Sequence, residues 1–153
     1  MISATSETAA TLLARAGELG DGRIDNTIIS TSVHVVTGTV VLVSMTIATL
    51  LVTRHAVAGR AIDAATKVAL TVAQVALVVQ VLLGIKLLDQ GQGIVQLYIH
   101  YIGGLAPLGA FLAAGWFARG DSPRSTRVLA VLLALGVFSA FMAFFIGRAY
   151  ANG

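Results

Sequence analysis

Two histidines in this chain share a local pattern that suits the binding of a flat metal ring. His34 begins the sequence His-Val-Val-Thr-Gly, and 66 residues later His100 begins His-Tyr-Ile-Gly-Gly. Each His is followed four residues on by a glycine, Gly38 or Gly104, which lies one turn deeper on the same face of a helix. Two neutral imidazoles that face each other can bind both axial positions of a haem iron. A glycine beside each of them leaves space for the edge of a porphyrin.

The composition around these residues is that of an integral membrane protein. The 153 residues are 57% hydrophobic and 11% charged, with a mean hydropathy of +0.89, whereas a soluble domain averages about 25% charged residues. The net charge of +3 comes from basic residues at the edges of apolar blocks, which argues against nucleic acid as a partner. The absence of Cys excludes disulfides, Cys-zinc sites, iron–sulfur clusters and covalent c-type haem attachment.

Four apolar segments are each long enough to cross a hydrocarbon core of about 30 Å. They cover Ile28–Val52, Val68–Leu88, Ile94–Phe117 and Val128–Ala149. The connectors 54–67 and 119–127 are rich in Arg and Lys, so by the positive-inside rule they face the cytoplasm. The sequence predicts an all-α, up-down-up-down four-helix bundle with both termini on the outer side. The protein is expected to be multi-pass in the cell membrane, specifically a prokaryotic plasma membrane.

The segment ahead of the first span, residues 1–27, lacks the basic start and long apolar run of a signal peptide. Within it, apolar residues recur at helical spacing, at Leu12, Leu13, Ala16 and Leu19. Gly20 can end such a helix. We expect a short amphipathic helix on the outer membrane surface, with a frayed terminus as the alternative. The transmembrane bundle is expected over residues 28–153.

The two histidines are also predicted to lie at the same depth. His34 precedes Arg54 by 20 residues and His100 precedes Arg119 by 19, so both rings lie about 29 to 30 Å from the cytoplasmic edge. In an up-down-up-down bundle the first and third helices are diagonal, and their inward side chains face each other. A single intramembrane His could instead bond a neighbouring helix, but the matched depth favours a paired site.

Two cations are expected at the same outer level. Lys86 lies 19 residues beyond Lys67, and Arg148 lies 21 beyond Arg127, on helices that run outward. They could pair with the propionates of a b-type haem, or simply snorkel to the interface. The sequences that end at these cations, Leu-Leu-Gly-Ile-Lys and Phe-Phe-Ile-Gly-Arg, echo each other. The chain therefore resembles two helical hairpins of one design.

Other residues have simpler interpretations. Gln74 and Gln80 are expected to form hydrogen bonds between helices, although Gln80 could also contact a haem edge or a quinone. Gly38 and Gly104 suit close helix packing as well as a porphyrin edge. His55 stands at the cytoplasmic edge and is expected to be solvated. Interfacial belts are expected to include Tyr98, Tyr101, Tyr150 and Trp116.

Part of the chain resembles one half-domain of the haem A synthase family. The resemblance lies in Val-Gln-Val-Leu-Leu-Gly at residues 79–84, followed by a short loop and by His100 on an apolar helix that ends at Arg119. The helix of His34 resembles the preceding His-bearing helix of that family. The resemblance covers about residues 31–119. It implies a four-helix bundle with a pair of His on its outer side, onto which His34 and His100 map.

The chain departs from that family in three ways. The family has eight helices in two halves, and only one half is present here. The family carries a Glu three residues before the first His of the pair, where Thr31 stands in this chain. Its outer loops often hold a Cys pair, and this chain has no Cys. The resemblance therefore implies a haem-binding bundle without the oxidation chemistry of the synthase.

The sequence predicts a membrane b-type cytochrome-like subunit that holds one haem b through His34 and His100. We expect electron transfer or an accessory role in a respiratory or photosynthetic complex, rather than catalysis. The expected partners are the lipid bilayer and other membrane subunits. A non-haem structural subunit and a haem-processing enzyme are the alternatives. One His alone could also ligate another flat tetrapyrrole, such as a chlorophyll.

Overall fold

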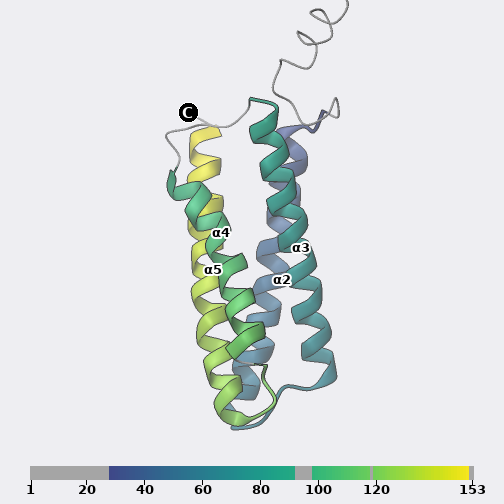
Figure 1. The fold of residues 1–153 in the computed structure, drawn as a ribbon, viewed down its shortest axis with the longest axis vertical. Coiled ribbons are helices and arrows are strands. Elements are labelled where there is room, and N and C mark those ends of the chain that lie inside the picture. Colours follow the sequence, from purple (N-terminus) through teal and green to yellow (C-terminus); the bar gives the residue numbers. More distant parts are fainter. Residues whose placement is uncertain (1–27, 92–97, 118, 152–153) are drawn as a thin grey trace, which may run out of the picture.

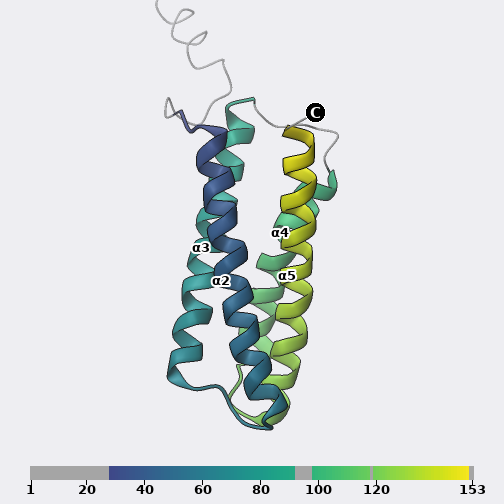
Figure 2. The same cartoon turned by 180° about the vertical axis from the view of Figure 1, so that it is seen from behind.

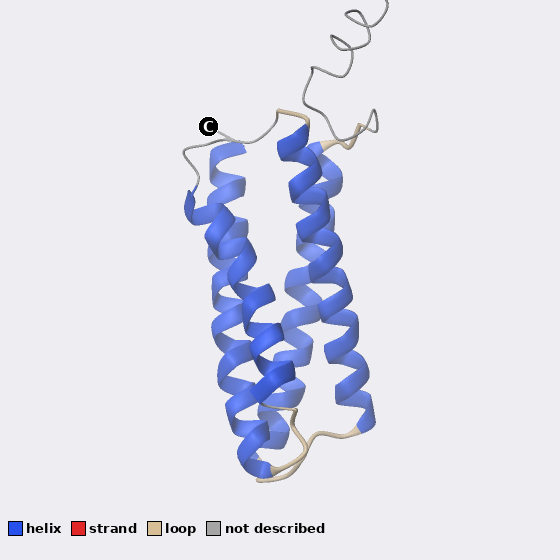
Figure 3. Ribbon diagram, viewed as in Figure 1, coloured by secondary structure: helices blue, strands red, loops and turns tan. Residues whose placement is uncertain are grey.

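The computed structural model describes residues 28–91, 98–117 and 119–151, and these ranges form four helices (Figures 1 and 3). The helices are α2 (Thr31–Val57), α3 (Ala64–Asp89), α4 (Tyr98–Phe117) and α5 (Pro123–Ala151). The predicted amphipathic helix and the rest of residues 1–27 lie outside the described residues. The all-helical fold that the sequence predicts is thus confirmed for the described part of the chain.

The four helices form a ring in which each packs against the next, and α5 closes the ring against α2 (Figures 1 and 2). The contact between α3 and α4 is much the sparsest of the four. In the described part of the chain the backbones of α2 and α4 make no close contact, so these two helices lie diagonally across the ring. The loops 58–63 and 119–122 lie together at one end, and the start of α2 lies at the other.

Three of these helices, α2, α3 and α5, are long and apolar enough to cross a membrane. α4 is the shortest of the four, with 20 residues, and it carries Pro107 in its interior. Many large apolar side chains point outward on the helices, including Leu50, Leu82 and Phe138, each about 60% exposed or more. Such exposure is expected where lipid rather than water surrounds the protein. The chain is therefore a multi-pass membrane protein.

Two helices begin before the apolar segments that the sequence predicts, and polar capping residues stabilise these starts. At the start of α3 the Asp63 carboxylate accepts a hydrogen bond of 2.8 Å from the Thr66 backbone N–H, and hydrogen bonding to Thr66 lowers the pKa of Asp63. At the start of α5 the Ser122 hydroxyl accepts from the Ser125 N–H at 3.2 Å. Pro123 occupies the first helical position there, where its missing N–H costs nothing.

The buried core fills the half of the bundle nearest the two loops. Its most deeply buried members come from α2, α3 and α5, and they are Met45, Ala48, Val52, Ala73, Leu77 and Leu133. The loops close this end, because the Ile62 N–H donates to the Gly120 carbonyl at 2.9 Å. Gly120 has a φ of +72°, and a Cβ there would lie 2.7 Å from the Ile62 side chain. Only glycine suits this position.

Candidate functional site

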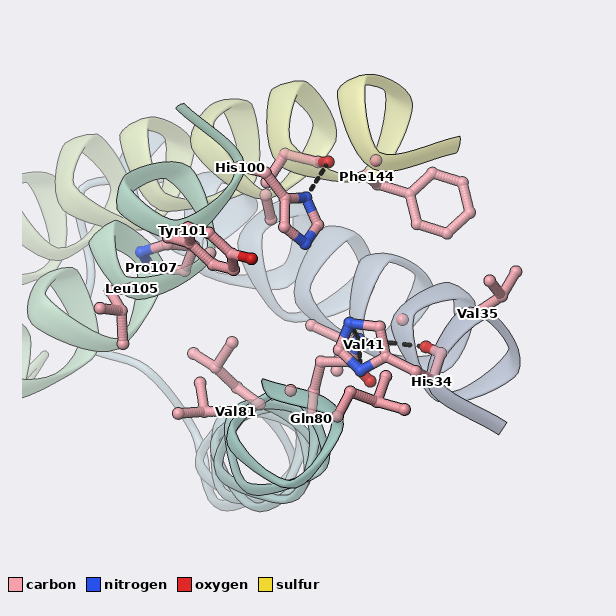
Figure 4. Close-up of a pocket in the computed structure, with 18 of the residues that line it drawn as sticks. His34, Val35, Val41, Gln80, Val81, His100, Tyr101, Leu105, Pro107 and Phe144 are labelled. Carbon is pink, nitrogen blue, oxygen red and sulfur yellow. Dashed lines mark hydrogen bonds between the residues drawn. The ribbon is translucent and has the colours of Figure 1, made fainter. Parts of the chain in front are cut away.

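A cavity of about 360 Å³ lies inside the other half of the bundle. All four helices line it, through residues between 31 and 42, 77 and 88, 100 and 107, and 140 and 148 (Figure 4). Its size falls in the usual range of ligand pockets, about 300 to 1,000 Å³. No group of three or more His, Asp or Glu side chains within the described ranges could hold a metal ion. A metal in this cavity would depend on two histidines and on donors that a cofactor brings.

His34 of α2 and His100 of α4 face each other across the cavity (Figure 4). Their ring centroids lie 6.4 Å apart, and the ring planes are inclined by 67°. A ligating imidazole nitrogen lies about 2.0 Å from the metal and about 1.2 Å from its own ring centre, so two imidazoles on opposite sides of one metal have centroids about 6.4 Å apart. The observed separation therefore fits two axial ligands of one iron.

His100 is oriented by the backbone of α5. Its Nδ1 lies 2.8 Å from the carbonyl oxygen of Ala143. Because a carbonyl only accepts, Nδ1 must carry the proton, and Nε2 keeps a lone pair for a metal. A backbone carbonyl in this position is the usual partner of a metal-ligating His, since it fixes the tautomer and raises the basicity of the other nitrogen.

His34 has a different neighbour, the amide of Gln80 on α3. The Gln80 Nε2 lies 3.2 Å from both ring nitrogens of His34. One atom equally distant from two diverging nitrogens lies over the face of the ring rather than along either lone pair. The same Nε2 donates to the His34 carbonyl at 3.1 Å, and the Gln80 Oε1 accepts a short hydrogen bond from the Thr37 hydroxyl. The predicted interhelical bonding of Gln80 is confirmed.

Glycines surround both rings. A Cβ at Gly147 of α5 would lie 2.8 Å from Cε1 of His100, and one at Gly84 of α3 would lie 3.3 Å from Cε1 of His34. A Cβ at Gly38 would meet the Gln80 amide at 3.1 Å, so packing already uses that position. At Gly104 a Cβ would meet no described atom within 4 Å, although this residue lines the cavity. Open space for a ring thus lies beside Gly104.

The two predicted cations are placed differently. Arg148 lines the cavity at the end of α5 and its side chain is exposed. Lys86 is not among the described lining residues, and its ammonium lies 2.5 Å from the Asp89 carboxylate. Both side chains of this pair are largely buried. The structure therefore brings His34, His100, Gly38, Gly104 and Arg148 together at one cavity, and it leaves Lys86 beside that group.

The prediction that His55 is solvated is wrong. Its side chain is buried, with 5% of the residue exposed, and its Nε2 lies 3.5 Å from the Asp63 carboxylate. Its Nδ1 is buried without a hydrogen-bond partner among the described residues. The reason is that α2 continues to Val57, which places His55 on a helical face that the bundle covers.

Three participants were not predicted from the sequence. Gly84 and Gly147 contact the His rings, and both lie inside the echoed sequences Leu-Leu-Gly-Ile-Lys and Phe-Phe-Ile-Gly-Arg. That echo was the signal that could have identified them. Tyr101, which the sequence predicts in an interfacial belt, lines the cavity with its ring centroid 5.7 Å from that of His100.

No family model matches the chain, and no curated protein or solved structure shows significant similarity to it. The resemblance to one half of haem A synthase therefore stays a prediction. Function has to be inferred from the chemistry of the cavity, because a helical bundle alone is compatible with many functions.

Proposed function

We propose that the chain is a b-type cytochrome-like membrane subunit that binds one haem b in the cavity, with His34 and His100 as axial ligands. The observation that carries this proposal is the 6.4 Å separation of the two imidazole centroids. The bond from the His100 Nδ1 to the Ala143 carbonyl supports it, because that bond leaves Nε2 available to the iron.

The chain's own residues would bind and orient the cofactor. Bound haem b supplies one-electron exchange between ferric and ferrous iron. The largely apolar lining excludes water from the ring, and Gly104 leaves room for its edge. Arg148 stands at the cavity rim, where its guanidinium can pair with a propionate. Among the described lining residues none is Asp or Glu, which favours electron transfer over acid–base chemistry on the haem.

The membrane arrangement we propose is up-down-up-down with α4 as the fourth span. The basic loops 58–63 and 119–122 and their flanks would face the cytoplasm. The start of α2 and the haem cavity would then lie toward the outer side of a prokaryotic plasma membrane. Electron exchange from that depth requires a partner in or near the membrane, and other membrane subunits of a respiratory or photosynthetic complex fit this role.

The decisive experiment is a reduced-minus-oxidised absorption spectrum of the purified full chain, followed by pyridine extraction of the pigment. We expect the sharp bands of a six-coordinate b-type haem and the pyridine adduct of haem b. A purified protein without pigment would favour the structural-subunit alternative. A magnesium tetrapyrrole in the extract would identify a chlorophyll protein instead.

The proposed orientation predicts which single cysteines react from outside the cell. Ser30 and Ala61 are exposed and lie at opposite ends of α2 and its following loop. Since the chain has no Cys, each variant carries a single thiol. We expect Ser30→Cys to react with an impermeant maleimide on intact cells, and Ala61→Cys to react only after lysis. The reverse pattern would place the haem cavity on the cytoplasmic side.

Arg148→Gln is expected to lower the haem midpoint potential by tens of millivolts. A positive charge disfavours the more positive oxidised iron, so its removal favours oxidation. Two unit charges about 10 Å apart interact by about 1.7 kcal/mol at an effective dielectric constant of about 20, or about 70 mV for one electron. Solvent at the exposed Arg148 side chain reduces this value.

The matched control for the potentiometric titration is Arg124→Gln. Arg124 lies on the same helix and is also exposed, but about 36 Å of helix separate it from Arg148. Its potential should equal that of the unmodified protein. Equal midpoint potentials in both variants would indicate that Arg148 acts only as an interfacial anchor.

A further inference from the structure

The two histidines are held in unequal ways. His100 donates from Nδ1 to the Ala143 carbonyl and rests against Gly147, so both its tautomer and its position are fixed. His34 has no such carbonyl among the described contacts of its ring. Its partner is an amide nitrogen over the ring face, which fixes neither the tautomer of the imidazole nor the direction of its lone pair. Of the two rings, His100 is the stronger and better oriented ligand.

From this asymmetry we infer that His100 is the permanent haem ligand and that His34 is an exchangeable one. A neutral diatomic gas of the carbon monoxide class can take the place of His34 on the haem. This inference rests on the proposed haem site. It adds a second ligand to that site and predicts that the bundle binds a gas in addition to exchanging electrons.

Gln80 is positioned to recognise such a ligand. Its Oε1 accepts from the Thr37 hydroxyl, and its Nε2 donates to the His34 carbonyl at 3.1 Å. Since an amide nitrogen has two N–H bonds, one remains, and it lies over the His34 ring. If the His34 ring left a bound haem, that N–H would be a donor beside the position that the ring vacates. Hydrogen-bond donors on this side of a haem determine how a small ligand binds.

The cavity also offers a route for an apolar gas. Ile85 and Leu88 of α3 and Leu105 of α4 line it, and each is between 45% and 54% exposed. α3 and α4 also make the sparsest helix contact in the ring. The cavity thus reaches the lipid-facing surface between these helices, where diatomic gases dissolve well. In a haem-loaded protein, the exchange would replace the His34 nitrogen by the carbon atom of the gas. No electron or proton is transferred.

Carbon monoxide binding to the dithionite-reduced, haem-loaded full chain tests the inference. We expect the unmodified protein to give a carbon monoxide difference spectrum at a rate that His34 departure limits. His34→Ala should keep its haem, with an affinity lowered by less than about 10-fold, and should bind the gas faster. His100→Ala should lose about 100-fold or more in haem affinity. Free imidazole should restore a six-coordinate spectrum in His34→Ala.

The role of Gln80 is read from the C–O stretching frequency of the bound gas. Gln80→Leu in the His34→Ala background should raise this frequency, because the donated hydrogen bond is lost. Gln74→Leu is the matched control, since Gln74 is an exposed amide on the same helix and lines a different groove. It should leave the frequency unchanged.

The outcomes separate this inference from the proposed function. A purified chain that binds no haem overturns the proposed function and the inference together. A haem-loaded protein that gives no carbon monoxide spectrum overturns the exchange alone. Equal haem loss in His34→Ala and His100→Ala does the same, because it shows two equivalent ligands. Since the first measurement uses the unmodified chain, it stands even if a variant fails to fold.

Discussion

Gly147→Ala is expected to remove most of the haem while leaving the four helices in place. The added methyl group would lie 2.8 Å from Cε1 and 2.9 Å from Nδ1 of His100, closer than real Cβ contacts come. The ring cannot simply move aside, because Nδ1 is bonded to the Ala143 carbonyl. Loss of such an orienting bond typically lowers metal affinity by about 10- to 100-fold. Haem content per chain after purification, measured by pyridine extraction, reports the loss.

Two glycine variants serve as comparisons. Gly84→Ala places its methyl 3.3 Å from Cε1 of His34, a contact that a small ring shift relieves. Gly84→Ala should therefore lose less of its bound haem than Gly147→Ala. Gly136→Ala also crowds α5, but against Ala110 at 3.3 Å and away from the histidines. It should keep its haem with a destabilisation of about 1 to 3 kcal/mol at most. Wild-type haem content in Gly147→Ala would contradict the placement of His100 as a ligand.

Hydropathy identified the helices but not their ends. The first segment was expected to end at Val52, and α2 continues to Val57. α3 begins at Ala64 and α5 at Pro123, each several residues before the predicted apolar segment. Caps set these starts through local hydrogen bonds, which a search for apolar blocks does not register. The extension of α2 also buries His55, so the error in the predicted end of this helix led to the error in the predicted exposure of that histidine.

The meeting of His34 and His100 followed from helical rise and basic loops alone. Equal depth on diagonal helices leaves few other arrangements, and the rings lie 6.4 Å apart. The partners of these rings depend on side-chain rotation, which spacing does not determine. The rise per residue of a helix predicts Lys86 at the level of the cavity, yet Lys86 forms an ion pair with Asp89 one turn along α3. A nearby carboxylate satisfies a cation in an apolar setting more directly than a distant propionate.

Gly104→Ala is expected to have opposite effects on the apoprotein and on haem binding. A Cβ at this position would meet no atom of the described residues within 4 Å, so the protein itself should tolerate the methyl group. Replacing Gly by Ala inside a helix usually stabilises it by about 0.5 to 1 kcal/mol. If a porphyrin edge occupies the space beside Gly104, the same methyl group collides with the bound ring. Haem affinity should therefore fall by about 10-fold or more, because a rigid ring held by His100 and enclosed by the helices has little room to shift away.

Two measurements on the same preparation separate these effects. Thermal loss of helical circular dichroism without haem reports the stability of the apoprotein, and haem titration reports affinity. Gly109→Ala is the matched control, because Gly109 lies on the same helix, has equal free space and is not among the described residues that line the cavity. It should gain the same stability and keep full haem affinity. If Gly104→Ala and Gly109→Ala bind haem equally well, the porphyrin does not lie against α4 at Gly104, and the ring must extend toward α3 or α5 instead.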